Sequence, residues 1–296
     1  MVGAFDHMIV RVVVGGKPVW MDGTGSYQAG ESADAASPDL GFALPVTGQL
    51  AGQLVPILPD QPGENLITTQ ETFTFTPDGL ELDVTSSFKG AAADHMRWIV
   101  ASTASHTLQQ RYLDYYERSY TGIERREAAE MTDAPASNHL VLRESYVLPA
   151  LALEDQDLTA DFPFLADGFD DLLPDVDAAS RTEPIYFEPR AERVHQVTVV
   201  NSPKALTAPE PLLIVAPAFG FGFEGHVDVK GTLHLLWHFT PRARSVAARD
   251  AEKLVDDADQ MRSATRQSWD VTRDKGFLAT LFDTLKAPAA TGAPTP

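Results

Sequence analysis

The sequence contains no cysteine, and this absence removes a whole set of chemistries. Disulfide bonds, thiolate metal sites, iron–sulfur clusters and a cysteine nucleophile are excluded for this polypeptide. A chain without thiols is compatible with both oxidising and reducing compartments, so the absence indicates no localisation.

Basic residues are also scarce, with 23 lysines and arginines against 42 acids and a formal net charge of −19. A phosphate backbone requires a basic face on the protein that binds it. We therefore expect no nucleic-acid partner.

Long apolar runs are missing as well. The most apolar stretch, Leu212 to Phe223, is short and is interrupted by Pro217, Gly220 and Gly222, whereas a membrane-spanning helix needs about 20 apolar residues. The first residues lack the basic start and apolar run of a signal peptide. We expect no membrane-spanning segment, and the localisation stays open.

Apolar residues make up 44 % of the 296 residues, which is enough to build hydrophobic cores. That length suggests about two domains. The expected fold class is α+β and β-rich, with the following organisation: a hairpin in 1–28, a loop-rich linker in 29–65, an α+β accessory domain in 66–150, an acidic connection in 151–180, a β-rich domain with a closing helix in 181–275, and a flexible tail in 276–296.

The first large unit follows a β-β-α-β-β order. Residues Leu108, Tyr112, Tyr115 and Tyr116 recur at the spacing of an amphipathic helix. The expected strands are Thr72–Thr76, Leu80–Phe88, Ile123–Met131 and His139–Leu148. This order predicts helices that cover one face of a sheet.

The second unit is mostly strand. We expect strands at Ile185–Glu188, Arg193–Val200, Leu212–Val215, His226–Val229 and Thr232–Phe239, and a helix at about Ala248–Ser268 with Ala251, Leu254, Ala258 and Met261 as its buried stripe. The alternating Phe/Gly run 219–225 is interpreted as a bend or bulge. Between the units, residues 154–177 hold nine acids and no base, which indicates a solvated connection because no calcium-loop spacing is present.

His7 and Asp22 are the most informative candidate residues. A two-residue loop at Gly15-Gly16 pairs Val14 with Lys17 and makes His7 and Asp22 diagonal neighbours on one hairpin face. An imidazole beside a carboxylate is the base-and-orienter half of a nucleophile–His–Asp triad. A three-residue loop would put Asp22 on the opposite face. The plainer alternative is an edge-hairpin histidine and a turn aspartate.

The remaining histidines offer less. His234 and His238 share one strand face, but about 13 Å separates residues at that spacing, which is too far for one metal ion. No partner can be named for the others, which are His95, His106, His139, His195 and His226. We expect no metal and no cofactor.

Residues 5–28, FDHMIVRVVVGGKPVWMDGTGSYQ, resemble the end of a transglutaminase-like core, and more narrowly that of bacterial multidomain proteins with such a core and β-rich C-terminal domains. The family pattern is a strand with a His, a turn, and then Trp-x-Asp-Pro-Thr. Gly23 stands in place of the usual proline. Weaker resemblances follow in Phe88–Arg97, Leu113–Ile123, Tyr146–Pro149, Arg181–Pro184 and Gly231–Phe239.

The resemblance implies that His7 and Asp22 match the catalytic His and Asp of the family, whose nucleophile is a Cys that precedes them. Because this chain has no Cys, the pair is vestigial or depends on a partner. Three hypotheses follow: a catalytically incomplete relative or fragment, with a missing N-terminal half before Met1; a non-enzymatic binding or scaffold module with a protein or glycan partner; and the C-terminal half of a split enzyme whose other chain supplies the Cys.

Overall fold

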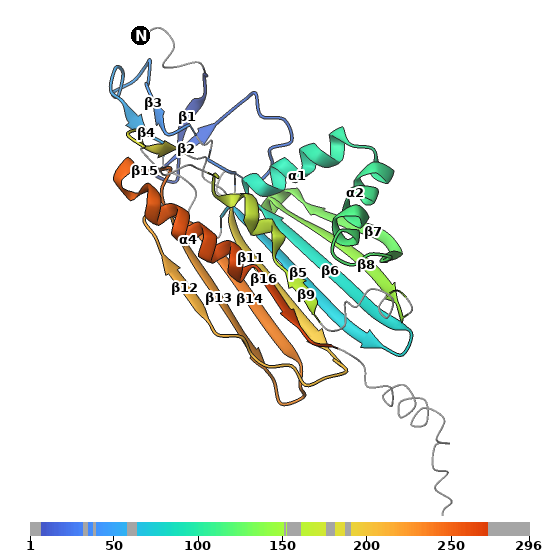
Figure 1. Cartoon of the computed structure of the whole chain (residues 1–296). Coiled ribbons are helices and arrows are strands. Elements are labelled where there is room, and N and C mark those ends of the chain that lie inside the picture. The colour runs from blue at the N-terminus through green and yellow to red at the C-terminus, as the bar shows by residue number, and fades with distance from the viewer. Residues whose placement is uncertain are drawn as a thin grey trace, which may run out of the picture.

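The computed structural model describes residues 7–31, 35–37, 40–57, 64–150, 152, 161–175, 181–186 and 191–271. The fold is α+β and dominated by strands (Figure 1). Its N-terminal part holds two small hairpins: β1 (Val10–Val14) with β2 (Lys17–Met21), and β3 (Phe42–Ala43) with β4 (Val55–Pro56).

The rest of the chain builds one large sheet and its cover. The elements are β5 (Leu66–Thr76), β6 (Gly79–Lys89), α1 (Ala91–Ser102), α2 (Ser105–Glu117), β7 (Glu124–Ala134), β8 (His139–Pro149), β9 (Phe162–Leu165), β10 (Ile185–Tyr186), β11 (Glu192–Val200), β12 (Leu212–Val215), β13 (Phe219–Val227), β14 (Leu233–Pro241), β15 (Ser245–Val246), α4 (Ala251–Ala264) and β16 (Arg266–Trp269), with short 3-10 turns at Pro135–Ser137, Asp167–Leu172 and Ala248–Asp250.

Eight strands form a single sheet in the order β12-β13-β14-β11-β5-β6-β8-β7. Its centre is a parallel pairing of β5 with β11, in which Phe73 lies opposite Val199. The stretches 66–150 and 181–275, which the sequence suggests as two units, thus contribute neighbouring strands to one sheet. They also share one hydrophobic core.

The core lies on one face of this sheet because apolar residues alternate along each strand. On β5, Phe73 and Phe75 are buried, whereas the alternating Thr72, Thr74 and Thr76 point to the opposite, half-exposed face. Figure 1 shows α1 and α2 at the β6–β8–β7 end and α4 across β11–β14. Aromatic rings fill the centre: Phe73 packs edge-on against Phe164, with centroids 5.1 Å apart.

Three sequence-based interpretations need correction. The Phe/Gly run is an unbroken strand, β13, with phenylalanines on the core face and glycines on the open face. The last helix ends at Ala264 and not at Ser268, because the next residues pair with β9. The acidic segment is more than a solvated connection, since its Phe162, Phe164 and Phe169 are fully buried.

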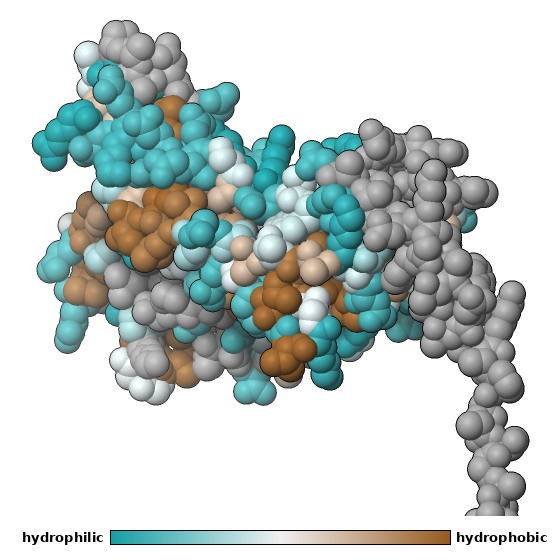
Figure 2. All heavy atoms as spheres, turned by 60° about the horizontal axis from the view of Figure 1, so that its bottom comes forward, coloured by the Kyte–Doolittle hydropathy of each residue, from teal (hydrophilic) through white to brown (hydrophobic). Residues whose placement is uncertain are grey.

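No helix in the described ranges has the length and apolar character needed to span a bilayer. On the face shown in Figure 2, apolar residues reach the surface in separate patches among hydrophilic ones.

Candidate functional site

The β1–β2 hairpin has the register that the sequence predicts. Gly15 and Gly16 form its two-residue turn with φ of 57° and 83°, a left-handed backbone that favours glycine. Val14 pairs with Lys17, and the pairing runs back to Val10 opposite Met21. Continued by one position, this register puts Asp22 opposite Ile9, and His7, two residues before Ile9, lies on the same side of the hairpin.

His7 and Asp22 meet directly. The Nε2 atom of His7 lies 2.7 Å from Oδ2 of Asp22, within hydrogen-bond distance. The side chains are partly exposed, 31 % for His7 and 17 % for Asp22, so a reacting group has access to the imidazole. The two residues that the sequence singled out are therefore in contact.

Thr24 fixes the second carboxylate oxygen of Asp22. Its backbone N–H and its hydroxyl both donate to Oδ1, at 2.9 Å and 2.7 Å. The backbone N–H of Thr24 is the main reason that the pKa of Asp22 lies below its ordinary value, followed by the Thr24 hydroxyl, with the hydrogen bond and charge of His7 adding to the effect against slight desolvation. Asp22 is therefore an ionised group with one oxygen committed to its own loop and one to His7.

This arrangement can hold an imidazole in a fixed orientation and stabilise its protonated form, which is what an Asp does for a catalytic His. Catalysis by such a pair also requires a nucleophile beside the imidazole. In the described ranges no hydroxyl or amine side chain bonds to His7, and the nearby Thr24 hydroxyl is engaged with Asp22. The pair is a base and its orienter without a nucleophile.

We predict that Thr24→Val raises the pKa of Asp22 toward its ordinary value, because it removes the hydroxyl donor and keeps the backbone N–H. His7→Ala should also raise it, because this variant removes the hydrogen bond and the charge of His7. Carboxyl carbon NMR titration of Asp22 in the wild type and both variants measures these changes. An Asp22 pKa that is unchanged in Thr24→Val would contradict the role of the hydroxyl.

The hairpin carries different chemistry on its two faces. On the His7 side, Arg11 lies opposite Trp20 with its guanidinium 5.8 Å from the ring centroid, and Trp20 is only 9 % exposed. The other face carries Val10, Val14 and Met21, which are all exposed, together with the position of Lys17 opposite Val14. Such a face is typical of a surface that another segment covers.

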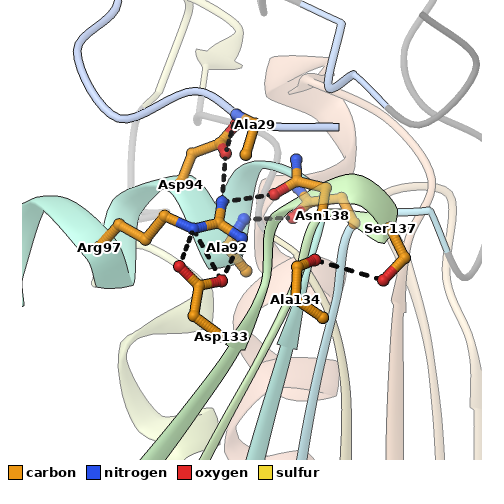
Figure 3. A network of polar contacts seen from close by, with 9 residues as sticks. Ala29, Ala92, Asp94, Arg97, Asp133, Ala134, Ser137 and Asn138 are labelled. Carbon is orange, nitrogen blue, oxygen red and sulfur yellow. Dashed lines mark hydrogen bonds and ion pairs between the residues drawn. The ribbon is translucent and has the colours of Figure 1, made fainter. Parts of the chain in front are cut away.

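A polar network fastens the segment after the hairpin to the large sheet (Figure 3). The Ala29 N–H donates to Oδ1 of Asp94 on α1, at 3.1 Å. Two more backbone bonds follow, from Gly30 to the Pro135 carbonyl at 2.8 Å and from Glu31 to the Ala136 carbonyl at 3.2 Å. The chain is therefore held to the β7–β8 turn a few residues after Asp22.

Arg97 is the centre of this network. Its guanidinium donates to both carboxylate oxygens of Asp133, to Asp94 at 2.9 Å and to the Asn138 side-chain oxygen at 2.6 Å. Burial raises the pKa of Asp94, against the hydrogen bonds and the Arg97 charge that oppose it. Arg97 thus joins α1, the β7–β8 turn and the segment from the hairpin.

The structure gives partners to histidines for which the sequence named none. His139 contacts Ser87, His95 stacks on Trp98, and His195 lies beside Glu71. His234 stacks with His226, and His238 contacts Glu192, so the two histidines of β14 have separate partners. Among the described residues, no group of three or more His, Asp or Glu side chains is arranged to hold a metal ion.

Sequence reasoning missed two buried carboxylates, Glu71 on β5 and Glu144 on β8, which are 4 % and 8 % exposed. A signal was present, because Glu71 alternates in phase with Phe73 and Phe75, and Glu144 with Leu142 and Tyr146. An acid on the apolar phase of a strand predicts a buried titratable group.

Comparison with known proteins finds no match to this chain among family models, curated sequences or solved structures.

Proposed function

We propose that His7 and Asp22 form the His–Asp half of a Cys–His–Asp acyl-transfer site of the transglutaminase-like kind, and that this chain carries the half without the thiol. The observation that supports it is the 2.7 Å contact between His7 Nε2 and Asp22 Oδ2, on a hairpin that resembles the family motif. The thiol comes from residues outside this sequence, which has no cysteine.

The roles follow from the geometry. When a thiol lies beside the free side of the imidazole, His7 accepts its proton, and the thiolate attacks the acyl carbon of a glutamine side chain. Asp22 remains ionised and stabilises the imidazolium. Protonated His7 then returns the proton to the leaving ammonia, and a second amine releases the acyl group from the sulfur. The face with the exposed Val10 and Met21 supports a missing neighbour that covers it.

The test is an acyl-transfer assay with a glutamine-donor peptide and a fluorescent amine. The chain alone is expected to give no product above buffer. Product should form when a Cys-bearing portion of a transglutaminase-like core, ending before its own His strand, is added. His7→Ala should reduce that product by about 10³-fold.

The matched control is His106→Ala, since His106 is an exposed histidine at the start of α2 whose side chain contacts Thr107. This variant should leave the product unchanged. Turnover by the chain alone that depends on His7, or turnover by the combined proteins that ignores His7→Ala, would contradict the proposal.

A second candidate function is a binding module, and the open face of the large sheet favours it. This face carries polar side chains in register across strands: Gln70 donates to Gln196 at 2.8 Å, and the His226 and His234 rings stack 4.8 Å apart. A glycan or protein that binds there should be lost with Gln196→Arg and retained with His7→Ala, as a glycan array and cross-linking would show. The reverse pattern would exclude this candidate.

A further inference from the structure

Helix α2 covers a pair of acidic side chains that the proposed acyl-transfer site does not use. Glu71 on β5 lies opposite Val84 on β6, and Val84 in turn lies opposite Glu144 on β8. Residues that are directly opposed across strands share a face, so both carboxyl groups point to the side that α2 covers. They form a pair separated by one strand.

Tyrosine hydroxyls connect this pair to the helix. Tyr116 of α2 donates to Oε1 of Glu71 at 2.8 Å, and Tyr146 of β8 donates to Oε1 of Glu144 at 2.5 Å. The rings of Tyr116 and Tyr146 lie 4.9 Å apart. One residue of α2 therefore bonds to one carboxyl group and packs on the ring that bonds to the other.

Positive charge near the pair is sparse. His195 of β11 has Nε2 3.2 Å from Oε2 of Glu71, yet the contact is not aligned as a hydrogen bond. Arg125 of β7 acts on Glu144 through its charge, which lowers the pKa of that carboxyl group. Its guanidinium donates to the Gln109 carbonyl of α2. The other titratable groups that face the pair are tyrosines of α2, namely Tyr112 and Tyr115. Within the described ranges, no lysine or arginine hydrogen-bonds to either acid.

Burial and charge repulsion therefore favour a proton on the pair. Desolvation is the main reason that the pKa of Glu144 rises to about 7, and the charge of Glu71 adds to it, against the Tyr146 hydrogen bond and Arg125. A carboxyl group with a raised pKa is more stable packed when it is protonated. The contribution of Glu144 to the stability of the packed helix is therefore full below the ordinary pKa of 4.5, and it is lost as the pH rises through about 7.

A small cavity of about 10 Å³, enough for roughly one water molecule, lies beside Glu71 between the helix and the sheet. Its lining consists of Glu71, Tyr115, Tyr116, Ser119, Tyr120 and Leu165.

We propose that Glu71, Glu144 and the two tyrosines form a proton-dependent latch, which holds α2 on the sheet when one proton is bound and releases the helix locally when both acids are ionised. This device is independent of the His7–Asp22 site. It makes the position of α2 respond to pH in the neutral range.

Hydrogen exchange measured by mass spectrometry at pH 5 and pH 8, after correction for the intrinsic pH dependence, tests the latch. The full chain is used, and peptides from α2 are compared with peptides from β13 and β14. The rise of the Glu144 pKa from 4.5 to about 7 predicts that the equilibrium constant for opening of α2 increases by roughly 70-fold between pH 5 and pH 8. The strands should show little change.

Glu144→Gln should remove the pH dependence of α2, because the amide carbonyl still accepts from Tyr146 but cannot ionise. Glu117→Gln, an exposed acid on the same helix, should leave it intact. Equal exchange of α2 at both pH values overturns the proposal. So does a pH response that persists in Glu144→Gln, or one that is shared by β13 and β14 and hence reflects global unfolding.

Discussion

Replacement of Trp237 by alanine is expected to lower the free energy of unfolding by about 5 kcal/mol, because it creates a large cavity and removes a buried hydrogen bond. Trp237 is fully buried on β14 and stacks on Phe223 with centroids 5.0 Å apart. Its indole N–H donates to the Ala264 carbonyl at 2.7 Å, at the end of α4. The variant therefore loses both its ring contacts in the core and a hydrogen bond that joins the sheet to this helix.

Urea unfolding followed by far-UV circular dichroism measures this loss. Trp98→Ala is the matched control, since Trp98 is half exposed on α1 and its substitution should cost less than about 1 kcal/mol. Equal losses in the two variants would show that the core contacts of Trp237 are not the cause.

Arg97→Ala is expected to cost about 3 kcal/mol, because it leaves the carboxylates of Asp94 and Asp133 without their cation. The cost is largest at Asp94, because burial already raises the pKa of this carboxyl group and so disfavours its ionised form. Arg97→Lys should recover only part of the loss, because an ammonium cannot make the two parallel bonds that the guanidinium makes to Asp133.

The same variant should also loosen the segment that follows the hairpin, because Asp94 accepts from the Ala29 N–H. Faster proteolysis near residue 29, together with the lower urea midpoint, measures both effects. Arg111→Ala, at an exposed position on α2, should change neither quantity. A stable Arg97→Ala variant with unchanged proteolysis would contradict the role of this network.

The local elements were predictable because their signals are local. The periodicity of Leu108, Tyr112 and Tyr116 predicted α2. The expected strand Thr72–Thr76 lies within β5, which begins earlier, at Leu66. The joining of the two large units was not predictable, since it depends on β5 pairing with β11. Gln70 and Gln196, which bond across that pairing, are 126 positions apart.

The candidate site shows the same division. The His7–Asp22 contact could be predicted, because a two-residue turn sets the register of the hairpin. The Arg97 network could not, because it gathers side chains from α1 and from the β7–β8 turn, which no short motif connects. The phenylalanines of the acidic segment were overlooked because charge dominated its composition, although their burial fixes the segment against the core.

We propose that His7, oriented by Asp22, serves a thiol that this chain does not contain. The most direct measurement is the rate at which iodoacetamide alkylates the Cys of a Cys-bearing core portion at pH 6, where an ordinary thiol of pKa about 8.5 is protonated. We expect that adding this chain raises the rate about tenfold or more, that His7→Ala abolishes the increase, and that His106→Ala preserves it. An alkylation rate that is the same with the wild-type chain and with His7→Ala would contradict the claim.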